Sequence, residues 1–430
     1  MSRFLGLASL AAIAATALAA LALLGGCGDG DEAQPATVRD AVRCDGGAAP
    51  DRSARCLPAD FPSWRFESLR PAPPGLFTVS LRVSGQARSW VIVFDQTGEP
   101  RWWHSPDTRA LWAQVLADGT IAWARSFGDG YGLDPRMAHE VRSQDGRLLR
   151  LVRTRGTIVD GHEFVEVGEG NVLVDAYAPE TADLRRFGGP AEAAVVSAEI
   201  QELDRQGRVR WRWSSRGRIG LDETGRWWRN VLANPRRRLQ GLASFDPVHI
   251  NSIEPRGRDE VVISTRHTDA VYGIRRSSGE IAWKLGGSRT PESLRVVGDP
   301  ARKLLGGQHD ARISAEGLLS VYDNGKDRPR RPRVVFYRLD LERRVALYRG
   351  QLNDPGVRTS HCCGSARQLP DGGWLVSWGD NRLVTRFDRE GRTLFRLRLA
   401  APTFRAVPVP PGAATAAGLG RGLARMAARR

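Results

Sequence analysis

The sequence predicts an all-β protein, a six-bladed β-propeller of four-stranded antiparallel blades. Three observations lead to this fold class. Hairpin patterns of strand, Gly or Asp turn and strand recur along the whole chain, their turn glycines are roughly 50 to 70 residues apart, and almost no helical period appears. Closing six such sheets into a ring leaves only short, protected edges.

Two kinds of hairpin alternate. The first kind has two apolar strands around a short turn, in AQVLADGTIAWAR, FVEVGEGNVLVDAY, INSIEPRGRDEVVIST, ARISAEGLLSVYD and ARQLPDGGWLVSWG. The second kind has a D-x-x-G type turn and occurs six times, at Gly98, Gly146, Gly207, Gly279, near Arg343 and at Gly391. Trp211 and Trp283 follow such turns, and we expect them to pack between blades without a functional role.

The first 27 residues predict a lipoprotein signal peptide. Arg3 precedes a long apolar stretch that ends at LLGGC, and residues 24–27 resemble a bacterial lipobox, whose cysteine, here Cys27, becomes lipid-modified. A plain signal peptide or a membrane anchor is the alternative. Residues 28–60 are rich in Gly, Ala, Asp and Pro and predict a flexible tether. The predicted protein is exported and membrane-anchored, on the periplasmic or cell-surface side.

Residues 61–408 form the predicted propeller, and residues 409–430 form an Ala, Gly and Arg tail. The tail has little apolar periodicity, so we expect it to be disordered or at most a weak basic helix.

The net charge of +16 raises the question of a nucleic-acid partner. Arginine supplies nearly all of this charge and is scattered among acidic residues. The exceptions are NPRRRLQ and KDRPRRPR, which we interpret as solvated faces. We therefore predict no nucleic-acid partner, although a positive field would attract an anionic small molecule.

Four cysteines remain besides the lipobox residue. In an exported chain an even number favours disulfides, and Cys44 with Cys56 would close a short loop in the tether. Cys362 and Cys363 are adjacent, so either a vicinal disulfide or two separate thiols is compatible with the sequence. No second Cys or His pair stands at zinc spacing, and we predict no metal there.

Three of the seven histidines occupy one equivalent position in successive repeats. His162, His249 and His309 lie eight residues before Gly170, Gly257 and Gly317, and Ser365 lies eight before Gly373. This position begins the strand that would line the central channel, so the three side chains should converge near the axis. The alternative is that each is a buried histidine that only hydrogen-bonds to its neighbours.

An arginine should join this cluster. The hairpin HINSIEPRGRDEVVISTRHT turns near Gly257, which places Arg266 opposite His249 at the same end of the blade. The next residue, His267, should point to the other face.

Three histidines with an arginine suit the transfer of a small oxyanion. Arginine matches the oxygen fork of sulfate, phosphate or carboxylate. A neutral imidazole can attack sulfur or phosphorus, and a protonated one can stabilise a leaving phenolate. A three-histidine metal site is the rival hypothesis, which the nearby arginine disfavours. No phosphate-binding G-x-x-x-x-G-K-[ST] loop occurs, and no cofactor is predicted.

The segments HINSIEP, ISTRHTDAVYGIRRSSGEIAWKLGG and GGQHDAR resemble the bacterial arylsulfate sulfotransferases and their arylsulfotransferase-like relatives. The resemblance covers most of residues 75–400. It implies a six-bladed propeller that moves a sulfuryl group from a phenolic sulfate ester to a phenol by a ping-pong route, without the nucleotide donor PAPS. It also implies that His309 is the nucleophile that becomes sulfohistidine, that His249 and Arg266 bind sulfuryl oxygens, and that His162 is the remaining channel histidine.

The chain departs from better-known members of that family. No room exists for their N-terminal dimerisation domain, so we expect a monomer. The segment HCCGS and the insert before His249 should lie near a channel mouth, where Trp227 or Trp228 could stack on a phenol ring or merely pack on the rim.

Two other functions are compatible with the repeat pattern. A non-catalytic lipoprotein propeller acting as a scaffold would not need the histidine cluster. A quinone-dependent dehydrogenase would typically need eight blades and channel acids, which the sequence lacks.

Overall fold

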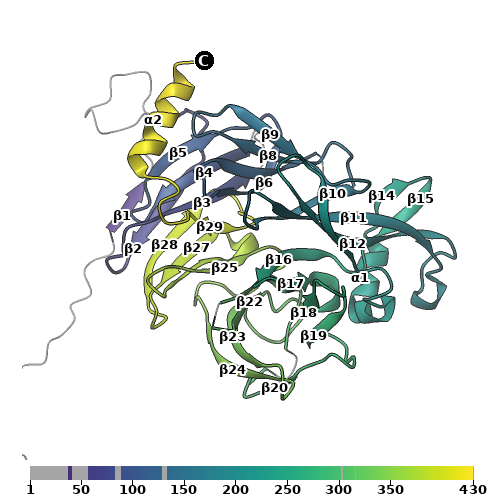
Figure 1. Ribbon diagram of the computed structural model, residues 1–430. Helices are drawn as coiled ribbons and strands as arrows, with labels where there is room; N and C mark the ends of the chain where they lie inside the picture. Colours follow the sequence, from purple (N-terminus) through teal and green to yellow (C-terminus); the bar gives the residue numbers. More distant parts are fainter. Residues whose placement is uncertain are drawn as a thin grey trace, which may run out of the picture. The chain divides into compact units, whose positions relative to one another are not determined.

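Six sheets follow one another around a ring in the computed structural model, which confirms the predicted six-bladed β-propeller (Figure 1). The structure describes residues 37–40, 57–82, 89–127, 133–301, 304–314 and 316–429. Residues Pro35–Arg430 belong to one compact unit. Every strand pair inside the four-stranded blades is antiparallel, and inner strands such as β17 and β22 are buried on both faces as they pack between neighbouring blades.

The first three blades are built as follows. Blade 1 contains β29 (Ala406–Pro408), β3 (Leu76–Arg82), β4 (Ser89–Asp95) and β5 (Pro100–His104); blade 2 contains β6 (Arg109–Val115), β7 (Ile121–Ser126), β8 (His139–Arg142) and β9 (Leu148–Val152). Blade 3 contains β10 (Ile158–Glu166), β11 (Val172–Ala182), β12 (Ala193–Leu203) and β13 (Val209–Ser214), extended by β14 (Arg236–Leu239) and β15 (Leu242–Phe245).

The other three blades complete the ring. Blade 4 contains β16 (Ile250–Arg256), β17 (Glu260–Thr265), β18 (Ala270–Arg275) and β19 (Ile281–Gly286); blade 5 contains β21 (His309–Ile313), β22 (Leu318–Asp323), β23 (Arg333–Asp340) and β24 (Val345–Leu352), with β20 (Arg295–Val297) beside β24. Blade 6 contains β25 (Ser365–Gln368), β26 (Trp374–Ser377), β27 (Leu383–Phe387) and β28 (Thr393–Leu399), with β2 (Trp64–Ser68) and β1 (Thr37–Asp40) at its outer edge.

The helical elements are short. They are α1 (Trp228–Ala233), α2 (Ala416–Ala427) and 3-10 turns at Arg185–Phe187, Leu221–Trp227, Arg266–Thr268 and Gly379–Asn381. None of the helices in the described part of the chain is long and apolar enough to cross a membrane.

Both ends of the chain close the ring. The C-terminal strand β29 is the inner strand of blade 1, while the N-terminal β2 pairs with the outer strand of blade 6. Ser365, at the position equivalent to the three histidines, donates a hydrogen bond from Oγ to the carbonyl oxygen of Ala406 at 3.2 Å. The serine therefore ties the closing strand to blade 6 rather than serving as a reactive group.

The prediction of a disordered C-terminal tail is wrong and its alternative, a helix, is the one observed, because Ala416–Ala427 form α2, which packs against β5. Thr415 caps the helix by accepting a hydrogen bond from the Gly418 amide at 3.0 Å. Leu419 and Met426 are buried beside Trp102. Two apolar residues seven positions apart lie on one face of a helix. Among Ala and Arg residues, this narrow apolar stripe is too weak a periodic pattern to predict the helix from the sequence.

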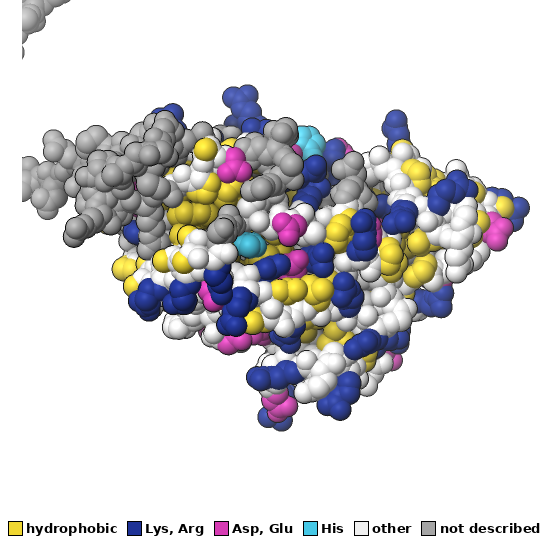
Figure 2. Space-filling model, turned by 90° about the horizontal axis from the view of Figure 1, so that it is seen from above, with side chains coloured by type: hydrophobic (Ala, Val, Ile, Leu, Met, Phe, Trp, Pro, Cys, Tyr) yellow, Lys and Arg dark blue, Asp and Glu magenta, His cyan; other side chains and the backbone are white. Residues whose placement is uncertain are grey.

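The interpretation of KDRPRRPR as a solvated face is also wrong. The side chain of Arg333 is 3% exposed and pairs with Asp299 and Asp323, and Arg328 and Arg330 form further ion pairs with buried aspartates. In NPRRRLQ, Arg237 and Arg238 are exposed, as expected, whereas Arg236 is partly buried. On the face seen in Figure 2, Lys and Arg are spread among Asp and Glu rather than gathered into one patch.

Several sequence predictions fall outside the described residues and stay predictions. They are the signal peptide with its lipobox Cys27, most of the tether, and the Cys44–Cys56 disulfide.

One buried histidine outside the channel, His139, gives a stability prediction. Its ring lies between Trp112 and Phe164, and neither ring nitrogen has a hydrogen-bond partner among the described residues. Burial lowers the pKa of His139 to about 3. The unfolded chain therefore binds a proton between pH 6.5 and 3 that the folded chain does not, so folding stability falls as the pH falls through this window.

We expect His139→Leu to raise the free energy of unfolding by about 1 kcal/mol at pH 7, because an unpartnered polar group is removed. The gain should grow toward pH 4. Denaturant unfolding at pH 7.0 and 4.5 measures it, with replacement of the exposed His361 by Leu as the control. An equal effect of the two substitutions at both pH values would contradict the prediction.

Candidate functional site

The three aligned histidines are aimed into the channel by irregularities of their strands. His162 lies in β10, His249 directly precedes β16, and His309 begins β21. The register with the next strand shifts at each of these places. A positive φ accompanies each shift, at Gly161 (86°), at His249 itself (54°) and at Asp310 (51°). Such bulges turn a side chain away from the regular pleat.

The side chains meet, as the repeat spacing predicts. The rings of His162 and His249 are 4.9 Å apart, centroid to centroid, in an edge-to-face arrangement. The ring of Phe404 lies 5.5 Å from His162 and 6.1 Å from His309. Arg266 also joins the cluster, because its amide donates a hydrogen bond to the His249 carbonyl oxygen at 2.8 Å and its charge influences His309.

The hydrogen bonds of His309 set its tautomer. Its Nδ1 lies 2.8 Å from Asn324 Oδ1, and the Asn324 amide nitrogen donates to Ser360 Oγ and to the Cys363 carbonyl oxygen. These donor contacts orient the amide, so the oxygen must face the ring and Nδ1 must carry the proton. His309 Nε2 therefore keeps its lone pair, and the backbone amide of Cys363 donates to it at 3.2 Å.

The other two channel histidines have carboxylate partners instead. His162 Nδ1 lies 2.7 Å from Asp160 Oδ1, and His249 Nδ1 lies 2.5 Å from Asp246 Oδ2. Tyr177 donates its hydroxyl proton to the same Asp246 oxygen at 2.9 Å. The nucleophile candidate thus has a neutral amide behind it, while its neighbours have carboxylates that can stabilise a positive ring.

All three channel histidines are neutral at pH 7. Burial, reinforced by Arg266, lowers the pKa of His309 to about 3, and burial lowers the pKa of His162 to about 4. The pKa of His249 lies well below its usual value through burial and through its neighbours His162 and Arg236. Neutral rings are the state in which an imidazole nitrogen can act as a nucleophile or accept a proton.

Arg266 is held in place from three sides. Its guanidinium carbon lies 4.4 Å from the ring centroid of Trp227, its Nη1 donates to His267 Nε2 at 2.7 Å, and its Nη2 donates to the His361 carbonyl oxygen at 3.1 Å. The opposed placement of Arg266 and His249 is as predicted. The segment HCCGS therefore lies at the site and helps to orient the cation.

The predicted stacking of Trp227 or Trp228 on a phenol ring is not compatible with the structure. Trp227 is 2% exposed, and the guanidinium groups of Arg226 and Arg266 lie over its ring. Trp228 is buried and stacks on Phe187. The alternative, packing on the rim, is the one observed, because the insert forms a short helix with its own apolar cluster.

His267 also differs from the prediction. We expected it on the face away from His249, but their ring centroids are 4.7 Å apart. A 3-10 turn begins at Arg266, so the two-residue alternation of the strand ends there. His267 Nδ1 donates to the Asp246 carbonyl oxygen at 2.6 Å, which leaves Nε2 to accept from Arg266.

Several residues of the site were not identified from the sequence. Phe404 comes from the segment just before β29, which reaches the channel only because the C-terminus closes blade 1. Arg236, from NPRRRLQ, lies 3.4 Å from His249 Nδ1 and 3.8 Å from Asp246 Oδ2. The sequence contains one clue to these contacts, because Asp160 and Asp246 stand shortly before His162 and His249. A carboxylate near a histidine commonly fixes its tautomer.

An ion-pair network lies directly behind the histidines along the channel. Glu163, the residue after His162, pairs with Arg312 and Arg405, and Asp310, the residue after His309, pairs with Arg312 and Arg367. Glu163, Asp310, Arg312 and Arg405 are buried, and Arg367 is partly exposed. The network joins four blades through charge-assisted hydrogen bonds and gives the histidines a rigid support.

Two sets of side chains have spacings that a metal ion could use. They are Asp246, His249 and His267, and Asp160, His162 and Asp175, whose ligand atoms lie within 4.8 Å of one another in each set. Both nitrogens of His267 are already hydrogen-bonded, as are the Nδ1 atoms of the other two histidines. Because hydrogen bonds account for these nitrogens, we assign neither set to a metal.

Cys362 and Cys363 are free thiols in the structure, so the vicinal disulfide left open by the sequence is not formed.

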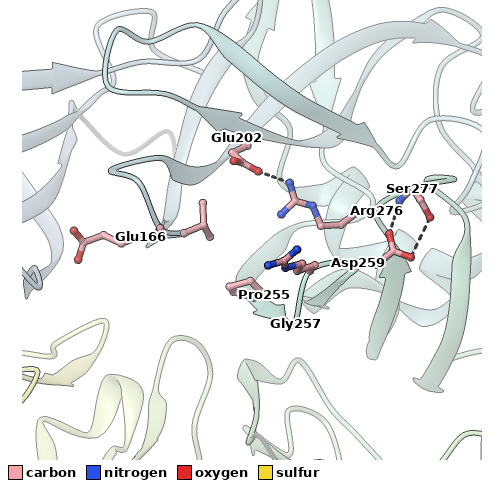
Figure 3. Close-up of a pocket in the computed structure, with 10 residues that line it drawn as sticks. Glu166, Glu202, Pro255, Gly257, Asp259, Arg276 and Ser277 are labelled. Atoms are coloured by element: carbon pink, nitrogen blue, oxygen red, sulfur yellow. Dashed lines mark hydrogen bonds and ion pairs between the residues drawn. The ribbon is translucent and has the colours of Figure 1, made fainter.

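Another cavity lies outside the histidine cluster, between blades 3 and 4 (Figure 3). It has a volume of about 640 Å³, and its charged lining is largely paired, with Arg276 bonded to Glu202 and Ser277 bonded to Asp259. No histidine or cysteine lines it. It offers no nucleophile comparable to His309.

Comparisons with known proteins agree with the geometry. The family model described as Arylsulfotransferase (ASST) matches residues 114–400, which contain all three channel histidines and Arg266. No curated protein is a significant match.

Solved structures match this chain at low identity. A protein of unknown function from Bacteroides caccae is 13% identical with a TM-score of 0.45, covering 79% of this chain and all of its own. A protein from Lactobacillus plantarum is 11% identical with a TM-score of 0.43, covering 78% of this chain and all of its own. A virginiamycin B lyase from Staphylococcus aureus is 8% identical with a TM-score of 0.36, covering 82% and 90%. Likenesses this distant say nothing about chemistry.

Proposed function

Because the chain belongs to the arylsulfotransferase family, we propose that it moves a sulfuryl group from a phenolic sulfate ester to a phenolic acceptor, through sulfohistidine at His309 and without PAPS. The observation that supports this most directly is the tautomer of His309. Its Nδ1 proton is held by Asn324, and its Nε2 lone pair faces the site beside Arg266.

In the first half-reaction, the His309 Nε2 lone pair attacks sulfur, and the bond between sulfur and the aryl oxygen breaks. The aryl oxygen leaves with the bonding electron pair and takes up a proton from water. The developing charge on the sulfuryl oxygens meets the guanidinium of Arg266, which is fixed before the reaction by its contacts with Trp227 and His361. The Cys363 amide, which reaches His309 Nε2 in the free enzyme, is placed to donate to a sulfuryl oxygen afterwards.

In the second half-reaction, the oxygen of the acceptor phenol attacks sulfur, and the bond between sulfur and His309 Nε2 breaks. The phenol proton must pass to a base. His162 and His249 are suited to accept it, since each has its Nδ1 hydrogen-bonded to a carboxylate, which makes Nε2 the nitrogen that would take the proton. Phe404, between His162 and His309, provides an apolar face for an aryl ring.

The predicted lipoprotein signal would place this reaction on the outside of a membrane, which agrees with a donor that is a simple ester rather than an intracellular nucleotide.

The test is release of p-nitrophenol from p-nitrophenyl sulfate by the purified protein, with and without phenol and with no nucleotide present. We expect a burst of about one equivalent without an acceptor, followed by sustained release only when phenol is added. No release from a panel of aryl sulfates with several acceptors would refute the proposal and favour a propeller that only binds.

A further inference from the structure

Two buried aspartates face each other behind His162. Asp160 lies on the bulge of β10, and Asp175 lies opposite this bulge on β11. Both side chains are fully buried. Asp160 Oδ1 accepts from His162 Nδ1 at 2.7 Å, and Asp175 Oδ1 accepts from the Glu163 amide at 3.1 Å. The second oxygen of each carboxyl group has no hydrogen-bond donor among the described residues.

A proton or a metal cation must lie between these two carboxyl groups. A carboxyl oxygen of Asp160 lies within 4.8 Å of one of Asp175. If both groups were ionised and shielded from water, they would repel each other without compensation. The pKa values of Asp160 and Asp175 are both raised well above the usual range, chiefly by burial and also by neighbouring carboxylates. One shared proton would give Oδ2 of one group a donor and Oδ2 of the other an acceptor.

The surrounding charges place this proton on Asp175. Asp160 accepts the His162 hydrogen bond and is favoured as an anion by Arg236, although Asp246 opposes this. Asp175 lies beside Glu163, which is ionised, because Arg312 and Arg405 lower its pKa to about 2 in spite of burial.

The Glu163 amide and a positive His162 would favour the Asp175 anion, but His162 is neutral in the resting protein. Tyr177 bonds to Asp246 and also favours the Asp160 anion, while His249 is neutral.

The pair also distinguishes His162 from His249. Arg236 lies within 3.4 Å of His249 Nδ1, and Arg266 acts on the same ring, so a second proton on His249 is opposed by two cations. His162 has the Asp160 anion on its Nδ1, and Asp246 also favours a positive ring, although Arg405 and Arg236 oppose it. A proton arriving at the site is therefore better stabilised on His162.

We propose that Asp160 and Asp175 share one proton, held on Asp175, and that this pair keeps His162 in the tautomer whose Nε2 accepts the proton of the phenolic acceptor. The inference rests on the proposed function. When the phenol oxygen bonds to sulfur, its proton moves to His162 Nε2, and the imidazolium stays bonded to the Asp160 anion. After the sulfated product leaves, the imidazolium gives this proton to solvent, which restores the neutral His162 of the resting protein. The two aspartates touch no substrate and act as positioning residues.

The test compares Asp160→Asn with Asp175→Asn. In Asp175→Asn the new amide can donate to Asp160 Oδ2 just as the acid does, so the rate at which phenol removes the sulfuryl group should stay within about threefold of wild type. In Asp160→Asn the anion is lost and the tautomer of His162 is no longer held. That rate should then fall about 10²- to 10⁴-fold, the contribution of a positioned base.

A second measurement does not depend on activity. Nitrogen-15 NMR of histidine-labelled protein should show His162 with its proton on Nδ1 in wild type and in Asp175→Asn, and a changed tautomer in Asp160→Asn. If no aryl sulfate is turned over, the proposed function fails while this readout still tests the carboxyl pair.

Equal damage from the two substitutions, or a Nδ1-deprotonated His162 in wild type, would overturn the proposal. So would one equivalent of a divalent metal, found by elemental analysis in the wild-type protein and lost in Asp175→Asn, because a metal ion would then occupy the place of the proton.

Discussion

Replacing His309 by alanine is expected to abolish aryl sulfate transfer, with a loss on the order of 10⁴-fold or more in kcat/KM. The substitution removes the only atom, Nε2, to which the sulfuryl group is proposed to bond, while Arg266 and Asn324 stay in place. The burst of p-nitrophenol should disappear. Wild-type protein mixed with donor alone should gain the mass of one sulfuryl group, and the variant should not.

His104→Ala is the matched control. His104 ends β5 and contacts Met426 of α2, outside the channel, so its loss removes one histidine without touching the site. We expect wild-type burst amplitude from this variant. A burst that survives in His309→Ala would assign the covalent bond to another residue.

Replacing Arg266 by methionine is expected to lower kcat/KM by about 10²- to 10³-fold, comparable to the loss of one preorganised donor to a developing oxyanion. The effect should appear mainly in kcat, because the charge on the sulfuryl oxygens increases toward the transition state. Arg266→Lys should recover only part of the rate, since an ammonium group lacks the planar fork of donors. Initial rates over a range of donor concentrations measure both effects.

Arg226→Met provides a close comparison. Both guanidinium groups lie 4.4 Å from the ring centroid of Trp227, but Arg226 pairs with Asp269 and Asp327 instead of facing the histidines. Its loss should reduce stability and leave kcat/KM within a few-fold of wild type. Similar losses of kcat/KM in the two variants would show that Arg266 matters for packing rather than for charge.

The repeat spacing of the sequence was enough to predict the convergence of the channel histidines. A hairpin repeats its geometry in each blade, so residues at the same distance from the turn reach the same end of the channel. The pairing of Arg266 with His249 followed from the same reasoning, because the register of a hairpin is set by its turn.

Predictions based on local alternation were less successful. His267 was placed on the wrong face because a 3-10 turn interrupts the strand at Arg266. Trp227 was considered a surface for a phenol, whereas Arg226 and Arg266 cover its ring. Both errors concern the place where a strand ends and tertiary contacts take over.

Repeat spacing was sufficient to predict the fold class, the number of blades and the meeting of three histidines with Arg266 in the channel, because these depend on periodic patterns that are local to each hairpin. The closure of the ring by β29, the approach of Phe404, and the hydrogen bonds of His309 to Asn324 and of His162 to Asp160 became visible only in the folded chain. Except for the bond between His162 and Asp160 within β10, these contacts join residues from separate strands or blades. Their protonation states depend on burial and on charges from distant parts of the chain, which no local pattern records.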